Sequence, residues 1–288
     1  MTNTRYRQIK DKAFFYTVCV ITAITMIPLI SIIWELIKKG IKHINFSFFV
    51  EVAPSTLDAM VAKTAGEGMP GGIANGIVGT LLIVSVASLI AIPIGVLAGV
   101  QLAEKANSKF SKAIRFTAEL LNGVPSIVLG IIAYAWIVRP ITGGYSALAG
   151  SLALAIMMLP LIIRSTEESI KMLPTSLKEA SLALGASYAT TTIKIILPSA
   201  MSGMFTGILL SISRVMGETA PLILTALGSS VVSLDLSKPS SAVPLLIWEF
   251  YNDPYLIDMI WSSSLFLLGL ILLFNITAKQ ISKKWKTQ

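Results

Sequence analysis

Six long apolar runs that carry very few charges are the feature that most constrains the fold of this 288-residue chain. A helix needs roughly 20 apolar residues to cross the ~30 Å hydrocarbon core of a bilayer. Only 13% of the residues are charged, about half the share in an ordinary soluble domain. The runs are residues 13–34, 77–102, 114–138, 147–163, 200–227 and 259–276. The sequence therefore predicts an all-α integral membrane protein with six transmembrane helices.

These runs divide the chain into tails, loops and a membrane core. The first run follows basic residues, as in a secretion signal, but it is longer than the 7–15 apolar residues of a signal peptide and no small-x-small cleavage site follows it. It is therefore predicted to be a retained anchor. The predicted parts are an N-terminal tail (1–12), the anchor (13–34), an external loop (35–76), a permease core (77–281) with a cytoplasmic loop (165–198) and an external loop (228–258), and a C-terminal tail (282–288).

Basic residues are distributed unevenly between the two sides of the predicted membrane core. If the N-terminus is cytoplasmic, each of the four inside segments holds four Lys or Arg residues. The outside segments together hold six, and among them the cluster Lys38, Lys39 and Lys42 is the contrary evidence. By the positive-inside rule, the bias predicts that both termini are cytoplasmic. The net charge of +8 then reflects membrane topology. No zinc-finger spacing, RNA-binding aromatic motif or long basic helix occurs, so no nucleic-acid partner is predicted.

Motifs for nucleotide binding and for catalysis are missing from the sequence. No G-x-x-x-x-G-K-[ST] pattern occurs, so any ATP that drives the protein would be bound by another chain. A single cysteine, Cys19, and a single histidine, His43, do not make a metal cluster. The motifs H-E-x-x-H and G-x-S-x-G are also missing. The chain is predicted to be non-catalytic and to hold no cofactor of its own.

A polar stretch at 179–198, E-A-S-L-A-L-G-A-S-Y-A-T-T-T-I-K-I-I-L-P, separates the fourth and fifth apolar runs. Ser176 and Glu179 have the spacing of a capping box, in which each residue's side chain accepts from the other's backbone amide. Gly185 can adopt the left-handed backbone conformation of a turn. The stretch predicts a short surface helix over 176–184, a bend at Gly185, and a second helix that enters the fifth span.

Two charged residues lie inside the fifth apolar run, in S-R-V-M-G-E-T-A-P at 213–221. Arg214 and Glu218 are four apart and share one helix face. A charge at membrane depth costs at least ~2.5–3.5 kcal/mol, so such residues usually face a partner or a water-filled path. The planar guanidinium suits bidentate binding of an oxyanion. The pair predicts a substrate pathway, with a structural ion pair as the alternative. Arg164 is either a second pathway residue or a positive-inside anchor.

Three shorter patterns predict packing elsewhere. Gly95 and Gly99 lie on one helix face and predict close contact with a neighbouring helix. Glu119 is expected to pair with Arg115 along their helix, or to contact another helix. The segment A-V-P-L-L-I-W-E-F-Y, residues 242–251, is too short to span. It predicts an interfacial or partly re-entrant helix, a docking surface for an external partner, or both.

Four stretches together resemble the permease subunits of ABC importers. They are G-G-I-A-N-G-I-V-G-T-L at 71–81, N-G-V-P-S-I-V-L-G at 122–130, the polar stretch at 179–198, and R-V-M-G-E-T-A-P at 214–221. The last is the most selective and is similar to the permeases of Pst-type phosphate importers. Ser181 departs from the E-A-A triplet of the polar stretch. The resemblance implies a type I (MetI-like) permease fold in the bacterial cytoplasmic (inner) membrane.

The resemblance also implies partners and roles. The partners would be a related permease (PstC), a pair of ATPase subunits (PstB) that use ATP and Mg, an external phosphate-binding protein (PstS), and membrane lipid. Coupling to the ATPase would involve Glu179, Ala180, Leu184 and Gly185. Inorganic phosphate would pass near Arg214. Two alternatives are an ABC permease for another oxyanion or nutrient, and an ion-coupled secondary transporter.

Overall fold

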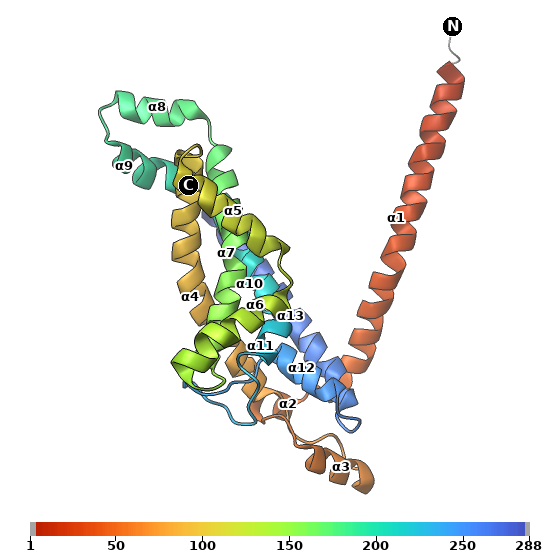
Figure 1. The fold of residues 1–288 in the computed structure, drawn as a ribbon. Helices are drawn as coiled ribbons and strands as arrows, with labels where there is room; N and C mark the ends of the chain where they lie inside the picture. Colours follow the sequence, from red (N-terminus) through yellow and green to blue (C-terminus); the bar gives the residue numbers. More distant parts are fainter. Residues whose placement is uncertain (1–3, 286–288) are drawn as a thin grey trace.

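The computed structural model describes residues 4–285, and in this range the chain is helical apart from turns, loops and one β-bridge between Leu227 and Ser240. The predicted tails at 1–12 and 282–288 lie partly outside the described residues. Most of the helices form an elongated bundle, and α1 stands apart from it over most of its length (Figure 1). The elements are α1 (Thr4–Gly40), η1 (Ile41–His43), α2 (Phe46–Val50), α3 (Thr56–Ala65), α4 (Ala74–Glu104), α5 (Lys109–Gly123), α6 (Ser126–Ala133), η2 (Tyr134–Thr142), α7 (Ala147–Lys171), α8 (Thr175–Ala183), α9 (Tyr188–Thr191), η3 (Thr192–Ile196), α10 (Leu197–Val215), α11 (Ala220–Ile223), α12 (Val243–Tyr251) and α13 (Ile257–Trp285).

Five of the described helices are long and apolar enough to cross a membrane. The number rises to six if a bent pair of helices counts as one span. The bent pair is α5 with α6 and η2, and the chain bends by 110° between its two parts. Pro125 causes the bend, because it lacks an amide proton and forces the preceding residue, Val124, into an extended conformation. The all-α membrane fold is therefore confirmed, but the predicted third span at 114–138 is not one continuous helix.

The predicted fifth span at 200–227 is also broken. Helix α10 ends at Val215, and α11 begins only at Ala220, with Pro221 in its first turn. The two broken spans meet, since a Cβ atom on Gly130 of α6 would lie 2.8 Å from the Cα atom of Pro221. A proline thus lies at or near the start of the helix that follows each break, and these two helices, α6 and α11, pack together.

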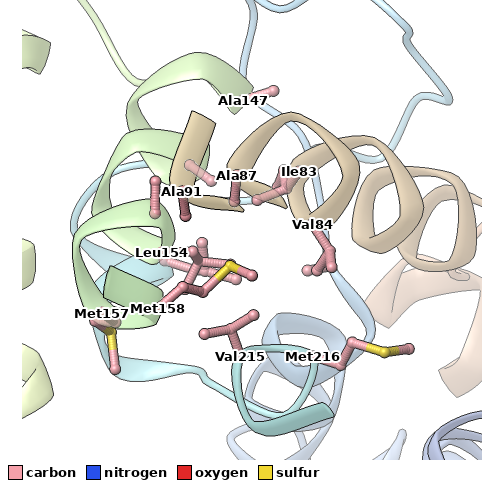
Figure 2. Close-up of a cluster of buried hydrophobic side chains, with 14 of the residues drawn as sticks. Ile83, Val84, Ala87, Ala91, Ala147, Leu154, Met157, Met158, Val215 and Met216 are labelled. Atoms are coloured by element: carbon pink, nitrogen blue, oxygen red, sulfur yellow. The ribbon is translucent and has the colours of Figure 1, made fainter. Parts of the chain in front are cut away.

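Helices α4 and α7 form the centre of the bundle. A Cβ atom on Gly95 would lie 2.7 Å from Ile162, and one on Gly99 would lie 2.5 Å from the Cβ atom of Thr166. The predicted close packing at these glycines is therefore confirmed. A buried apolar cluster lies between α4, α7 and the end of α10 (Figure 2). Its labelled members are Ile83, Val84, Ala87, Ala91, Ala147, Leu154, Met157, Met158, Val215 and Met216.

Helix α1 contacts the bundle near its C-terminal end. The carbonyl of Gly40 accepts a hydrogen bond from Ser262 Oγ of α13 at 2.7 Å. The ammonium of Lys39 lies 4.4 Å from the ring centroid of Trp261. In the most apolar 18-residue stretch of α1 no residue is buried. In the corresponding stretch of α7 two thirds of the residues are buried. The first span is thus joined to α13 at one end only.

Short helices cover the end of the bundle opposite α8. Helix α12 is buried on one side, and its Val243, Leu246 and Phe250 form an apolar cluster with Phe48 of α2. The helix predicted at 242–251 is therefore confirmed. Trp248 and Tyr251 are exposed. Whether this surface faces lipid or an external partner stays a prediction.

Candidate functional site

Helices α8 and α9 form a hairpin that projects beyond the bundle at the end where α4 and α7 finish (Figure 1). Gly185 makes the turn between them with φ of 83°, in the left-handed region that glycine adopts readily. The Ser187 side chain caps α9 by accepting from the amide of Thr190 at 3.2 Å. The predicted order of surface helix, bend and second helix is confirmed.

The predicted capping box at the start of α8 is wrong. Helix α8 begins at Thr175, directly after Pro174, and no side chain caps it. Pro174 has φ of −65° and ψ of 136°, so the extended residue before the helix is the proline itself. Ser176 therefore lies inside the first turn, where its backbone is already helical and its side chain does not cap Glu179.

The residues expected to contact an ATPase lie on the exposed part of the hairpin. Glu179, Ala180 and Gly185 are exposed, and Leu184 is 89% exposed. Ser181 instead faces inward, where its hydroxyl lies 2.9 Å from that of Thr191. The structure therefore gathers the four predicted coupling residues on one projecting segment that ends in an uncovered leucine.

Arg214 and Glu218 lie at the break in the fifth span. Helix α10 ends at Val215, and the amide of Glu218 bonds back to the carbonyl of Val215 at 3.2 Å. Arg214 Nε lies 3.8 Å from Glu218 Oε1, and the two side chains are 53% and 19% exposed. The guanidinium is thus only loosely held and faces outward from this single chain, so its donors can reach another group.

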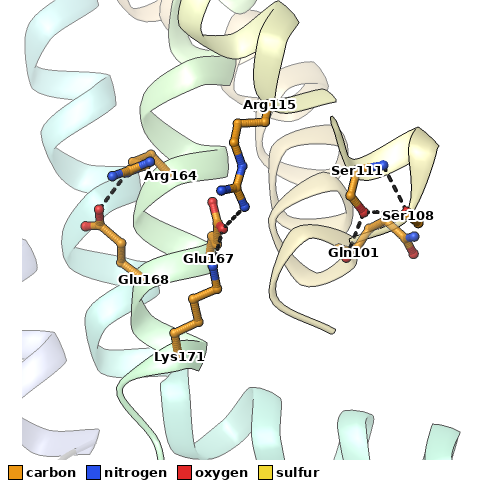
Figure 3. Close-up of polar contacts among 8 residues, drawn as sticks. All are labelled: Gln101, Ser108, Ser111, Arg115, Arg164, Glu167, Glu168 and Lys171. Carbon is orange, nitrogen blue, oxygen red and sulfur yellow. Dashed lines mark hydrogen bonds and ion pairs between the residues drawn. The ribbon is translucent and has the colours of Figure 1, made fainter. Parts of the chain in front are cut away.

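Arg164 is in a different environment, near the α8 end of α7. Its Nε lies 2.6 Å from Glu168 Oε1, and both side chains are 58% exposed. It also lines a cavity of about 210 Å³ with Arg115, Glu119 and Glu167. Figure 3 shows the ion pair of Arg164 and Glu168 beside the contacts that Glu167 makes with Arg115 and Lys171.

Arg164 is not brought next to Arg214. Gly207 of α10 packs on Ser165 of α7, and the two helices are antiparallel. With this register, Arg214 lies at the level of Met158 on α7. Met158 precedes Arg164 by six residues, so the two arginines are separated by roughly 9 Å along the helix axis. The two predicted pathway arginines therefore lie at different depths.

The predicted pairing of Arg115 with Glu119 is wrong. Arg115 Nη2 instead donates to Glu167 Oε1 at 2.5 Å, and Lys171 Nζ contacts the same oxygen at 2.5 Å. Glu119 is exposed to solvent, whereas Glu167 is buried on α7. The buried carboxylate attracts the arginine because it has little access to water.

The sequence patterns missed two charged residues that the structure buries. Glu167 and Glu104 have side chains only 4% and 7% exposed. Glu104 contacts Lys178 and Tyr188 of the hairpin, 74 and 84 residues away. No local spacing links residues so far apart. The only signal for Glu167 was an acidic pair, Glu167–Glu168, at the end of an apolar run.

Similarity to known proteins covers nearly the whole chain. Residues 91–287 match the model of the family described as binding-protein-dependent transport system inner membrane component. A phosphate transport system permease protein PstA from Pasteurella multocida (strain Pm70) is 35% identical over 97% of this chain and 97% of its own length. A PstA from Yersinia pestis is 36% identical over 90% of this chain and 85% of its own length.

Solved structures share the fold. An inward-facing MetNI methionine ABC transporter matches with a TM-score of 0.64 at 22% identity, over 73% of this chain and 94% of that one. A bacterial alginate ABC transporter, solved with its pentasaccharide-bound periplasmic protein, matches with a TM-score of 0.68 at 13% identity, over 97% of both chains. With its broken spans and projecting hairpin, the chain belongs to the PstA family of binding-protein-dependent transport permeases of the inner membrane.

Proposed function

We propose that this chain is the membrane-spanning permease subunit of an ATP-driven importer of inorganic phosphate. It forms half of the translocation pathway and couples to a separate ATPase. The observation that carries the proposal is the projecting α8–α9 hairpin, with Leu184 uncovered at its turn. The substrate is inferred from relatives that are named phosphate transport system permease proteins. These relatives match this chain over most of their length.

The hairpin is the proposed docking element for the ATPase pair, PstB, which would bind ATP and Mg. An exposed leucine beside a polar surface is typical of an interaction site. Glu179, Ala180, Leu184 and Gly185 are the proposed contacts. Because the glycine turn and the Ser181–Thr191 bond hold the two short helices together, a push on α8 is passed to α10 rather than absorbed by a loop.

The proposed pathway runs past the break in the fifth span. Arg214 has guanidinium donors that its 3.8 Å contact with Glu218 leaves open, and an arginine suits an oxyanion with several acceptor oxygens. Its exposure in the single chain fits a pathway that a second permease completes. That second subunit is the related chain PstC. Arg164 lies nearer the α8 end and is proposed as a later contact on the inward route.

The proposed orientation places the hairpin in the cytoplasm. The start of α1, the end of α13 and the hairpin lie at one end of the molecule (Figure 1). The basic residues of the sequence favour the cytoplasm for this end. The opposite end, with α2, α3 and α12, then faces the external phosphate-binding protein, PstS.

Reconstitution of the chain with PstC and PstB in proteoliposomes tests this function. We expect phosphate-loaded PstS to stimulate ATP hydrolysis and to drive phosphate uptake, and sulfate offered in the same assay to do neither. Stimulation by a different anion would overturn the substrate. Uptake driven by an ion gradient in liposomes without the ATPase would overturn the transporter class.

A further inference from the structure

Three side chains join the hairpin to the end of α4. The carboxylate of Glu104, the last residue of α4, accepts hydrogen bonds from the ammonium of Lys178 on α8 and from the hydroxyl of Tyr188 on α9. Both bonds reach the same oxygen, Oε2. One carboxylate therefore contacts both helices of the hairpin at once.

The three groups also contact one another. Lys178 Nζ lies 3.1 Å from the hydroxyl oxygen of Tyr188 and 4.5 Å from the centroid of its ring. Hydrogen bonds that involve a charged group are about twice as strong as neutral ones. The cluster of Glu104, Lys178 and Tyr188 is closed, since each member touches both of the others.

Burial separates this cluster from an ordinary surface ion pair. The Glu104 side chain is 7% exposed and that of Lys178 is 30% exposed. Burial by itself lowers the pKa of Lys178, but the bonds to Glu104 and Tyr188 outweigh it and hold the pKa above its usual value. A buried carboxylate that loses its partner is left uncompensated, so breaking this cluster is costlier than breaking a solvated pair.

The rest of α8 has few attachments to the membrane core. Helix α8 packs against α9 and η3, and Ser181 is its one buried residue. It follows α7 after the short segment Met172–Pro174 and ends at the Gly185 turn. Lys178 therefore gives a force on α8 a direct contact with α4.

Helix α4 is well placed to receive that force. It packs along α7 more extensively than any other pair of helices described here, with Gly95 and Gly99 in close contact. Close-packed interiors deform little and transmit displacement. A shift of the inner end of α4 is thus carried into the apolar cluster beside the break in the fifth span.

We propose that Glu104, Lys178 and Tyr188 make the hairpin and the inner end of α4 move as one body when the ATPase closes. In this role Glu104 is a positioning residue that couples ATP hydrolysis to transport. This inference rests on the proposed function, because it assumes that an ATPase docks on α8. It adds a second route of force, through α4, to the covalent route through α10.

The functional test compares transported phosphate with hydrolysed ATP in proteoliposomes that contain the full transporter. We expect Glu104→Leu to retain assembly and ATP hydrolysis but to lower the phosphate moved per ATP about tenfold. The exchanged pair Glu104→Lys with Lys178→Glu should restore part of that ratio, and Lys178→Arg should keep it. Lys112→Met, which removes an exposed lysine of α5, is the matched control and should leave the ratio unchanged.

A spectroscopic test does not depend on the identity of the substrate. With Cys19→Ser as background, spin labels at Thr175→Cys and Lys105→Cys report the distance between α8 and the end of α4. We expect one narrow distance distribution that ATP leaves unchanged, and a broad one after Glu104→Leu. A distance that shifts with ATP in an otherwise unaltered transporter, or an unchanged transport ratio in Glu104→Leu, would overturn the inference. A wild-type complex without phosphate-stimulated hydrolysis would instead overturn the proposed function.

Discussion

The guanidinium of Arg115 on α5 is bound to the carboxylate of Glu167 on α7, with Nη2 and Oε1 2.5 Å apart. The carboxylate is 4% exposed and also contacts Lys171. This contact ties the first half of the broken third span to the central helix of the bundle (Figure 3). The neighbouring pair on α7, Arg164 with Glu168, is open to solvent.

Arg115→Met is expected to destabilise the protein more than Arg164→Met. The first change leaves a buried carboxylate with one partner fewer, which costs about 1–3 kcal/mol. The second removes an exposed pair, which contributes about 0–1 kcal/mol. Thermal unfolding of both variants in the same detergent checks this difference. Equal melting temperatures would mean that Glu167 is solvated in the folded protein.

Gly99→Ala is expected to destabilise the contact between α4 and α7. The added methyl group would lie 2.5 Å from Thr166 Cβ and 2.8 Å from the carbonyl oxygen of Ile163, so the helices must separate. Such overpacking costs about 1–3 kcal/mol. Gly269→Ala in α13 is the matched control, because no atom lies within 4 Å of its added methyl group. Thermal stability should fall for the first variant and hold or rise slightly for the second. The reverse order would contradict the packing described here.

Arg214→Leu is expected to abolish phosphate uptake while the subunits still assemble and bind the ATPase. The residue lies at a helix end with a loose 3.8 Å contact, so its removal breaks no close structural pair. Arg214→Lys keeps the charge but not the planar fork, and should retain only part of the uptake. Uptake into vesicles and co-purification of the subunits are the two measurements. Normal uptake by Arg214→Leu would exclude this arginine from the pathway.

Glu249→Gln is expected to stabilise the protein at neutral pH but not in acid. Burial raises the pKa of Glu249, which lies on α12 beside a cavity of about 670 Å³ that Asp58 and Asp253 also line. A carboxyl whose pKa is raised by folding favours the folded state while it is protonated, and this contribution is lost as pH rises through the folded pKa. Glutamine stays neutral throughout.

Melting curves recorded at neutral pH and at about pH 4 measure this effect. The acid sample lies below the ordinary pKa of glutamate, which is about 4.3. The stabilisation should appear only in the neutral sample. Glu67→Gln changes an exposed carboxylate just after α3, at the same end of the molecule as α12, and should have no effect at either pH. A gain of similar size at both pH values would show that the carboxyl is not penalised by burial.

Local patterns predicted the elements whose cause is local. The apolar runs predicted the spans, because an uncharged stretch of that length has few other stable environments than a bilayer. Gly185 predicted the hairpin turn, because left-handed backbone geometry favours glycine wherever it occurs. Gly95 and Gly99 predicted the close approach of α7, because residues four apart share a helix face. The capping box failed because Pro174 itself starts α8.

The sequence by itself therefore determined the membrane class, the helical hairpin that turns at Gly185, and the family resemblance. Only the tertiary structure decided that Arg115 pairs with Glu167 rather than Glu119, and that Glu104 holds the hairpin. It also decided that the third and fifth spans are broken, and that the helices after the two breaks, α6 and α11, pack together at Gly130 and Pro221. The reason is physical: the partner of a charged side chain depends on which carboxylate is buried, and burial arises only when distant helices pack.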